Sequence, residues 1–251
     1  MERVDDTVGV LSLDFRQLGV GQRLTALRQF GPALVELSPQ RVSATDVPGY
    51  VAALLGTVSI PTKRVVVVTY CAAFGLVGEI GRALATKGVE VVHVVAVDAV
   101  VPDFEDVLEA FNEVFRQFGT TYPDVEPVTA TDVAGGLGRL LFAAMAHLSR
   151  RVSATLGTHS NRASATIADD LLARYETWLA YVLACYGASA TPWHTASTLV
   201  CSPDRVGAAA DAHFDRTIRC QGEPGDCACV VSVVEEIRVD SAISSLTPST
   251  A

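Results

Sequence analysis

The sequence has little positive charge and no long hydrophobic run, and these two absences exclude several classes of protein. Lys and Arg number 19 against 28 Asp and Glu, which gives a formal net charge of −9. Nucleic acids and anionic membrane surfaces are therefore expected to be poor partners. A membrane-spanning helix needs about 18 or more apolar residues in succession, whereas His93 and Asp98 interrupt the most hydrophobic stretch, 89–101. The sequence thus predicts no membrane span.

Motifs for common cofactors and metals are missing as well. No G-x-G-x-x-G follows a predicted strand and no G-x4-G-K-[ST] is present, so the glycines form no fingerprint for a dinucleotide or a phosphate. The cysteine-rich stretch 220–229 has the spacings C-x6-C and C-x-C, which differ from the paired C-x2-C of zinc sites. The sequence therefore predicts no cofactor and no metal.

The first residues, MERVDD, are charged and acidic, without the hydrophobic region of a signal peptide. This favours a cytoplasmic protein. In a reducing compartment cysteines are free thiols by default, so we expect this of all six cysteines in the chain.

What is present is a composition and a pattern typical of a compact α/β protein. Hydrophobic residues make up 49% and charged residues 19% of the 251 residues, which suits a folded domain and argues against disorder. Apolar segments with strand character alternate with segments of helical spacing, and this alternation is the signature of a doubly wound parallel sheet. The predicted strands cover 8–15, 33–38, 63–70 and 89–99, and the predicted helices lie within 16–31, 45–58 and 73–88.

The alternation stops after the fourth predicted strand. Residues 103–186 have a mostly helical pattern, which predicts a long helical insertion before the sheet resumes with strands at 195–202 and 217–222. Residues 227–243 predict a final helix, although their β-branched residues make a strand the rival. A polar tail, 244–251, is expected to be disordered.

The stretch RVVVVTYCAAF, residues 64–74, raises the question of whether Cys71 is a nucleophile. A continuous apolar strand ends at one reactive side chain and passes directly into a helical pattern. Several enzymes present a nucleophile in such a strained turn, where the helix N-terminus favours a thiolate and helps to bind an oxyanion. The alternative is a plain buried cysteine, since free Cys is among the most buried residue types.

The same stretch resembles the thioesterase branch of the α/β-hydrolase fold, enzymes that accompany polyketide and nonribosomal peptide assembly lines. Their elbow commonly reads G-Y-S-x-G and is followed by a helix with a recurrent Glu. Here Tyr70, Cys71, Glu79 and Gly88 fall at the matching positions, within T-Y-C-A-A and the helix and strand that follow it. Thr69 stands where the family has a glycine, which is a departure from the pattern.

The resemblance extends over about 8–237 and is specific between 64 and 99. It implies an α/β-hydrolase fold, with a central, mostly parallel sheet and a helical lid insertion at about 103–186. It also implies a single domain over 1–251.

The resemblance further implies the site residues. Cys71 takes the position of the nucleophile, and Asp98, at the end of the next strand, takes that of the acid. Asp204 is the alternative acid, because another subgroup takes it from after the following strand. The oxyanion hole needs two backbone N–H groups, which the resemblance assigns to Ala72 and to Phe15 or its neighbour in the loop after the first strand.

Arg16 in that loop is unusual for the family. It is expected to pair with Asp98, with Asp14 or with a substrate carboxylate. For Asp98, a plain structural role also stays open, as a strand-end carboxylate that caps the next loop.

The base is the clearest departure from the family. The family carries its histidine in a loop reading close to pG-D-H, and here EPGDC places Cys227 at that position. A cysteine is a poor general base. Three alternatives stay open: another histidine reaches the site, Cys71 ionises alone, or the site no longer acts as a hydrolase. A Cys71–Cys227 disulfide is a further possibility.

The candidate replacements for the base are His159, His194 and His213. His93 alternates along a predicted central strand, so we expect a packed core histidine. His147 lies on a predicted helix face and is expected to be solvated.

The function implied by the resemblance is that of an enzyme acting on acyl or aminoacyl thioesters. The partner would be an acyl or peptidyl carrier protein bearing a phosphopantetheine thioester. Cysteine in place of serine favours acyl transfer or cyclisation over hydrolysis, through a thioester at Cys71. The alternatives are a non-hydrolytic cyclase or isomerase without a working triad, and a catalytically dead scaffold.

Overall fold

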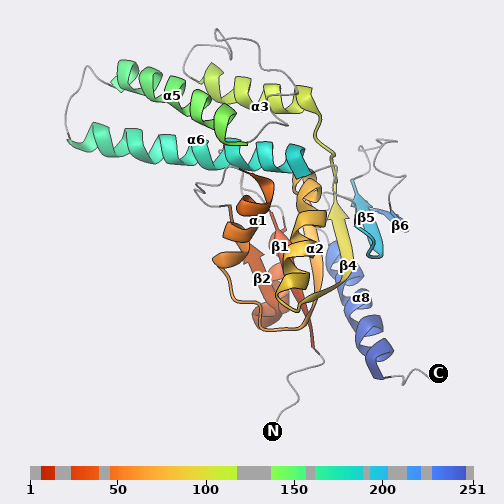
Figure 1. Ribbon diagram of the computed structural model, residues 1–251. Coiled ribbons are helices and arrows are strands. Elements are labelled where there is room, and N and C mark those ends of the chain that lie inside the picture. Colours follow the sequence, from red (N-terminus) through yellow and green to blue (C-terminus); the bar gives the residue numbers. More distant parts are fainter. Residues whose placement is uncertain are drawn as a thin grey trace.

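A computed structural model shows a six-stranded sheet in the order β2-β1-β3-β4-β5-β6, in which all neighbouring strands run parallel (Figure 1). The structure describes residues 7–14, 24–39, 46–117, 137–156, 162–188, 193–202, 214–221 and 228–246. The strands are β1 (Val8–Leu13), β2 (Leu34–Leu37), β3 (Arg64–Tyr70), β4 (Glu90–Val97), β5 (Ser197–Cys201) and β6 (Arg216–Arg219).

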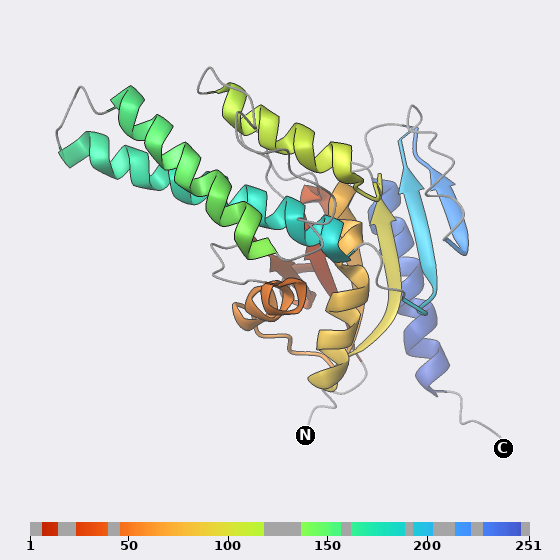
Figure 2. The same ribbon diagram turned by 45° about the horizontal axis from the view of Figure 1, so that its top comes forward.

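Helices cover both faces of this sheet. Figure 2 shows α1 (Val47–Gly56) and α2 (Val77–Thr86) on one face and α8 (Ala228–Leu246) on the other. The short helical segment η2 (Thr25–Ala33) packs against α8 and β1. The final segment is therefore a helix, as predicted, and the rival strand is wrong.

Strand β3 is central because its side chains suit burial on both faces. Val65 and Val67 lie in the core beneath α1 and α2, and Val66 and Val68 lie in the core beneath η2 and α8. All four are at most 1% exposed. A continuous apolar run is typical of a parallel strand with helices on both sides.

The strand order places a topological switch point between β1 and β3. From β1 the chain moves outward to β2, returns to β3 on the other side of β1, and then continues through β4 to β6. In open parallel sheets, ligands bind at the carboxyl ends of the strands at such a point. The end of β3, where Cys71 follows, is therefore the part of the fold most suited to a site.

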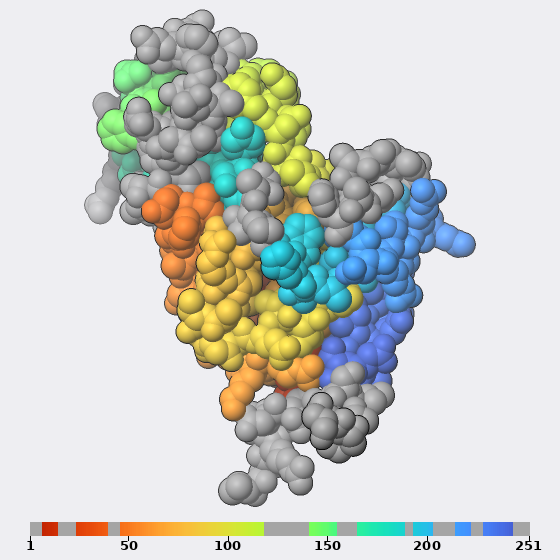
Figure 3. All heavy atoms as spheres, turned by 45° about the vertical axis from the view of Figure 1, so that its right-hand side comes forward, coloured from red at the N-terminus to blue at the C-terminus, as the bar shows by residue number. Residues whose placement is uncertain are grey.

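The helical insertion predicted between β4 and β5 is present. It contains α3 (Phe104–Arg116), α5 (Leu137–Leu156) and α6 (Arg162–Ala188). Figures 1 and 2 show α6 crossing above α1 and α2, with α5 alongside it. In the space-filling view the insertion helices stand above the sheet and its covering helices (Figure 3). Buried side chains of α6, among them Leu179 and Leu183, join the core beneath α1 and α2.

Two expectations for single residues are wrong. His147 is not simply solvated: its ring packs edge-on against Phe115, with 5.3 Å between the ring centroids. Cys220 and Cys229 are not free thiols, because they form a disulfide between the end of β6 and the start of α8. Cys71 forms no disulfide, so the Cys71–Cys227 pairing is wrong too.

Membrane-spanning helices and metal-ion clusters are both absent from the described ranges. No helix within them has both the length and the apolar composition of a membrane span. Likewise, no group of three His, Cys, Asp or Glu side chains in these ranges is arranged to hold a metal ion.

Candidate functional site

Cys71 lies in a sharp turn between β3 and a short helical segment, η3 (Cys71–Leu76), that leads into α2. Its φ angle is 54°, in the left-handed region. For a residue with a Cβ this conformation costs roughly 1–2 kcal/mol. Such strain persists where the surrounding structure imposes it, and it clusters at functional sites. The turn expected at this cysteine is therefore present.

Asp98 adopts the same strained conformation at the end of the next strand. Its φ angle is 45°. Because Tyr70 is the register partner of Val97, Cys71 and Asp98 leave neighbouring strands side by side. The two turns are also bonded to each other, since the N–H of Val100 donates to the carbonyl of Cys71 at 3.3 Å. Among the described residues, only these two combine a positive φ with a side chain.

The Asp98 carboxylate is directed toward β5 and is buried, with 6% of the residue exposed. One of its oxygens, Oδ1, accepts the N–H of Ser202 at 2.8 Å and the Ser202 hydroxyl at 3.1 Å. The Asp98 N–H in turn donates to the carbonyl of Val200 at 2.8 Å. Since β5 and β3 lie on opposite sides of β4, these bonds hold the carboxylate on the side of β4 away from Cys71.

These contacts agree with the structural alternative for Asp98, a carboxylate that caps the turn after the following strand. The acid of a catalytic triad is likewise buried and held by hydrogen bonds. Asp14 is a second strand-end carboxylate of this kind: at the end of β1 it accepts the N–H of Leu24 at 2.7 Å.

The other side of Cys71 is covered by the last turns of α6. A Cβ built on Gly75 in η3 would lie 2.5 Å from the carbonyl oxygen of Cys185. The two backbones therefore meet so closely that only glycine fits, and this is how α6 docks on the segment that begins with Cys71. Cys185 is completely buried here, whereas Cys71 is partly exposed.

Cys185 lies near the buried hydroxyl groups of Tyr181 and Tyr50. Burial raises the pKa of the Cys185 thiol well above its ordinary value, against a smaller lowering by its hydrogen bond to Tyr181. Burial likewise raises the pKa of the Tyr181 hydroxyl, which is hydrogen-bonded to Cys185. Burial also raises the pKa of Tyr50 on α1. At neutral pH all three side chains are protonated, so these buried groups of α6 and α1 carry no charge.

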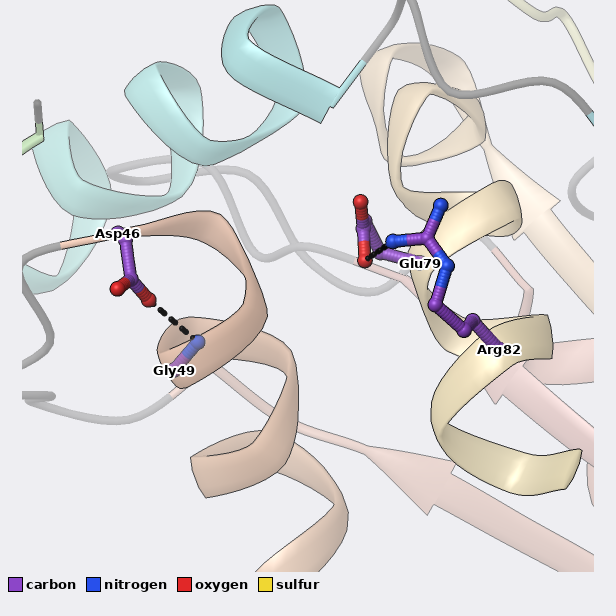
Figure 4. A network of polar contacts seen from close by, with 4 residues as sticks. All are labelled: Asp46, Gly49, Glu79 and Arg82. Carbon is purple, nitrogen blue, oxygen red and sulfur yellow. Dashed lines mark hydrogen bonds and ion pairs between the residues drawn. The ribbon is translucent and has the colours of Figure 1, made fainter. Parts of the chain in front are cut away.

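Glu79, the glutamate that recurs in the thioesterase family, lies in α2, which follows η3. Its side chain pairs with Arg82, one turn on in α2, at 2.6 Å (Figure 4). In the same view Asp46 caps the start of α1 by accepting the N–H of Gly49 at 2.7 Å. Both carboxylates stabilise helices in the layer beneath α6.

The described histidines do not supply the missing base. His93 is half-buried rather than part of the core; its Nε2 bonds to the Thr198 hydroxyl at 3.0 Å, and burial lowers its pKa. His147 packs on α3. His194 is exposed and precedes β5, so it lies at the amino end of that strand, whereas Cys71 and Asp98 lie at the carboxyl ends.

Several predicted site residues fall outside the described residues. They are Phe15, Arg16, His159, Asp204, His213 and Cys227. Ala72 is described as the second residue of η3, directly after Cys71, where an N–H for an oxyanion hole is expected.

No family model matches the chain, and no curated protein matches it by sequence. Solved structures do match. A four-domain nonribosomal peptide synthetase, in a structure bound to AMP and glycine, matches with a TM-score of 0.50 and 15% identity, over 96% of this chain and 20% of the synthetase. The chain has an α/β-hydrolase fold.

Two thioesterase structures also match, with lower TM-scores. Human thioesterase 2 matches with a TM-score of 0.45 and 11% identity, over 96% of this chain and 100% of that one. The NocB thioesterase domain matches with a TM-score of 0.46 and 14% identity, over 95% of this chain and 96% of that one. This chain spans about a fifth of the synthetase. The similarity therefore concerns the fold alone.

Ser202, Tyr181 and Cys185 were not predicted as part of the site. Ser202 is the last residue of a predicted strand, and the other two lie in a long helical pattern. Nothing in a single sequence indicates that these segments meet at the elbow.

Proposed function

We propose that this protein is a thioesterase-like enzyme that acts on carrier-protein-bound acyl or aminoacyl thioesters through a thioester intermediate at Cys71. The observation that supports this most is the left-handed turn at Cys71, between β3 and η3. It places a partly exposed thiol at the carboxyl edge of the sheet, beside the switch point of the fold.

In the first step the Cys71 sulfur forms a bond to the thioester carbonyl carbon. The bond from that carbon to the phosphopantetheine sulfur then breaks, and the thiol proton of Cys71 ends on the departing sulfur. The N–H groups of Ala72 and Phe15 are the proposed donors to the oxyanion. In the second step the nitrogen or oxygen of an amine, a hydroxyl or water bonds to the acyl carbon, the bond from that carbon to the Cys71 sulfur breaks, and the proton lost by the acceptor returns to Cys71.

The assignment of Asp98 as the acid and of Cys227 to the position of the base is part of the proposal. Asp98 lies one strand from Cys71, in a turn bonded to it. Its carboxylate is held toward β5 by the N–H of Ser202.

Transfer or cyclisation is proposed ahead of hydrolysis. A thioester on Cys71 has nearly the same energy as the thioester substrate, so the acyl group can be passed to an acceptor. In this proposal α3, α5 and α6 act as the lid, and the chain forms one domain.

The test uses acyl and aminoacyl thioesters of N-acetylcysteamine, with and without a primary amine as acceptor. We expect release of the free thiol that depends on the amine, and loss of that release in Cys71→Ala. Thiol release by wild type without any dependence on an acceptor would mean a hydrolase. Equal release by Cys71→Ala would contradict the proposal.

A second candidate is a non-hydrolytic cyclase or isomerase on the same fold. The observation in its favour is that His93 and His147 are engaged elsewhere and His194 lies at the opposite edge of the sheet. It predicts turnover that survives Cys71→Ala, measured by mass spectrometry of the products.

A further inference from the structure

Both ends of β5 carry a serine that binds a carboxylate in the same way. At its carboxyl end, Ser202 donates its N–H and its hydroxyl to Asp98 Oδ1 at 2.8 and 3.1 Å. At its amino end, Ser197 donates its N–H and its hydroxyl to Asp215 Oδ2 at 2.7 and 3.4 Å. The two contacts are chemically alike, but only the first lies at the edge that carries Cys71.

Ser202 is linked to the elbow by a short series of bonds. Its two donors bind Asp98, whose turn continues to Val100, and the N–H of Val100 binds the carbonyl of Cys71 at 3.3 Å. Asp98 is also held by its own N–H, which donates to Val200 at 2.8 Å. The ends of β3, β4 and β5 are thereby joined across the site.

The geometry points to Ser202 as a positioning residue for the reaction at Cys71, acting through the carboxylate of Asp98. This inference rests on the proposed function. A buried carboxylate requires hydrogen-bond donors, and two donors on one oxygen fix both its position and its direction. Every residue except proline supplies the backbone donor at position 202, so the hydroxyl is the part that is specific to serine.

The consequence for the chemistry is electrostatic. The N–H and the hydroxyl of Ser202 together hold the negative charge of Asp98 on the β5 side of β4, away from the sulfur of Cys71. With the N–H as the only donor from Ser202, the carboxylate can pivot about that bond toward β3, where it opposes a thiolate at Cys71. The same rotation would also move the Asp98 carboxylate away from the group that it is proposed to orient.

The experiment compares Ser202→Ala with Ser197→Ala, because both remove one hydroxyl from one serine–carboxylate contact on the same strand. We expect Ser202→Ala to lower kcat for thioester turnover by about tenfold, as for loss of a hydrogen bond to a charged group, with KM unchanged. Ser202→Thr, which keeps the hydroxyl, restores it. Ser197→Ala leaves kcat unchanged.

A double-mutant cycle with Asp98→Asn tests whether Ser202 acts through Asp98. Asp98→Asn alone is expected to lower kcat, and adding Ser202→Ala should then change nothing further. Full wild-type kcat in Ser202→Ala, or the same loss with and without Asp98→Asn, would overturn the inference. If Ser202→Ala does not fold, Ser202→Cys, a weaker donor of similar size, takes its place.

The rate of Cys71 alkylation by iodoacetamide in the same variants separates this inference from the proposed function. If wild type turns over no thioester, the proposed function fails. The positioning role then stands on alkylation alone: it is supported by a slower rate in Ser202→Ala that disappears in the Asp98→Asn background. It is overturned by equal rates in wild type and Ser202→Ala.

Discussion

Cys71 and Cys185 are the same residue type on facing segments, yet their surroundings differ in every respect that governs thiol chemistry. Cys71 is partly exposed, in a left-handed turn at the end of β3. Cys185 is completely buried on α6, and burial raises its pKa. Reactive thiols sit in partly exposed places, whereas buried ones are inert. The comparison indicates that position in the fold, not the presence of a thiol, decides which cysteine reacts.

The two sides of the turn at Cys71 also differ from each other in charge and packing. Toward α6 the groups are neutral and closely packed, with Gly75 against the backbone of Cys185. Toward β4 and β5 they are polar and charged, with Asp98 bonded to Ser202. The neutral side holds the elbow in place, and the polar side is where proton transfer is proposed.

The largest expected effect separates the two thiols by their chemistry. Cys71→Ala should reduce thioester turnover by about a thousandfold or more, because it removes the nucleophile. Cys185→Ala should keep turnover within about threefold, because it removes only a buried thiol that touches no substrate. Steady-state kinetics with both variants, checked for folding by circular dichroism, measure this. Equal losses of turnover in both variants would show that the two thiols do not differ in the reaction.

Alkylation should separate the two thiols in the unmodified protein. With iodoacetamide between pH 7 and 9, Cys71 should react at least about a hundredfold faster than Cys185. Burial raises the pKa of Cys185, so below that pKa its thiol stays protonated and its labelling stays slow as the pH rises. Peptide mapping over time measures both rates. Early labelling of Cys185 in folded protein would contradict the account.

The close contact between η3 and α6 should appear in stability. Gly75→Ala places a Cβ 2.5 Å from a backbone oxygen, and such overpacking costs typically about 1–3 kcal/mol. The matched control is Gly81→Ala in α2, where the new Cβ meets nothing within 4 Å. Relief of glycine entropy in a helix should make that variant more stable by about 0.5–1 kcal/mol. Urea unfolding gives both values, and equal stabilities would show that α6 does not dock here.

The smallest expected effect is a difference in stability that tests whether the backbone at Cys71 is strained. Its φ of 54° suits glycine better than alanine, so Cys71→Gly should be more stable than Cys71→Ala by about 1 kcal/mol. At Cys185, within α6, the order should reverse, because glycine is the poorer helix former. Chemical denaturation of the four variants gives the two differences. Alanine favoured at both positions would mean that the turn at Cys71 is not strained.

The parts of the fold set by local pattern were predictable from the sequence. The valines of β3 predicted a central strand, and the abrupt change to helical spacing after Tyr70 predicted the turn at Cys71. Both are present. The final helix and the helical insertion were predicted from spacing in the same way.

The contacts made by side chains at the ends of the strands and helices were not predictable from local patterns. Cys220 and Cys229 form a disulfide because the end of β6 meets the start of α8, whereas compartment alone favoured free thiols. Ser202 binds Asp98 across 104 positions of sequence. No local pattern indicates that either pair comes together, and Phe15 and Cys227 lie outside the described residues.

Intact-protein mass spectrometry after incubation with a panel of acyl and aminoacyl thioesters tests the central claim most directly. Our account predicts a mass increase of one acyl group, mapped by peptide analysis to Cys71 and absent from Cys71→Ala, with Cys185 unmodified. An adduct mapped elsewhere, or no adduct with any thioester while Cys71 is still alkylated by iodoacetamide, would contradict a covalent thioester mechanism.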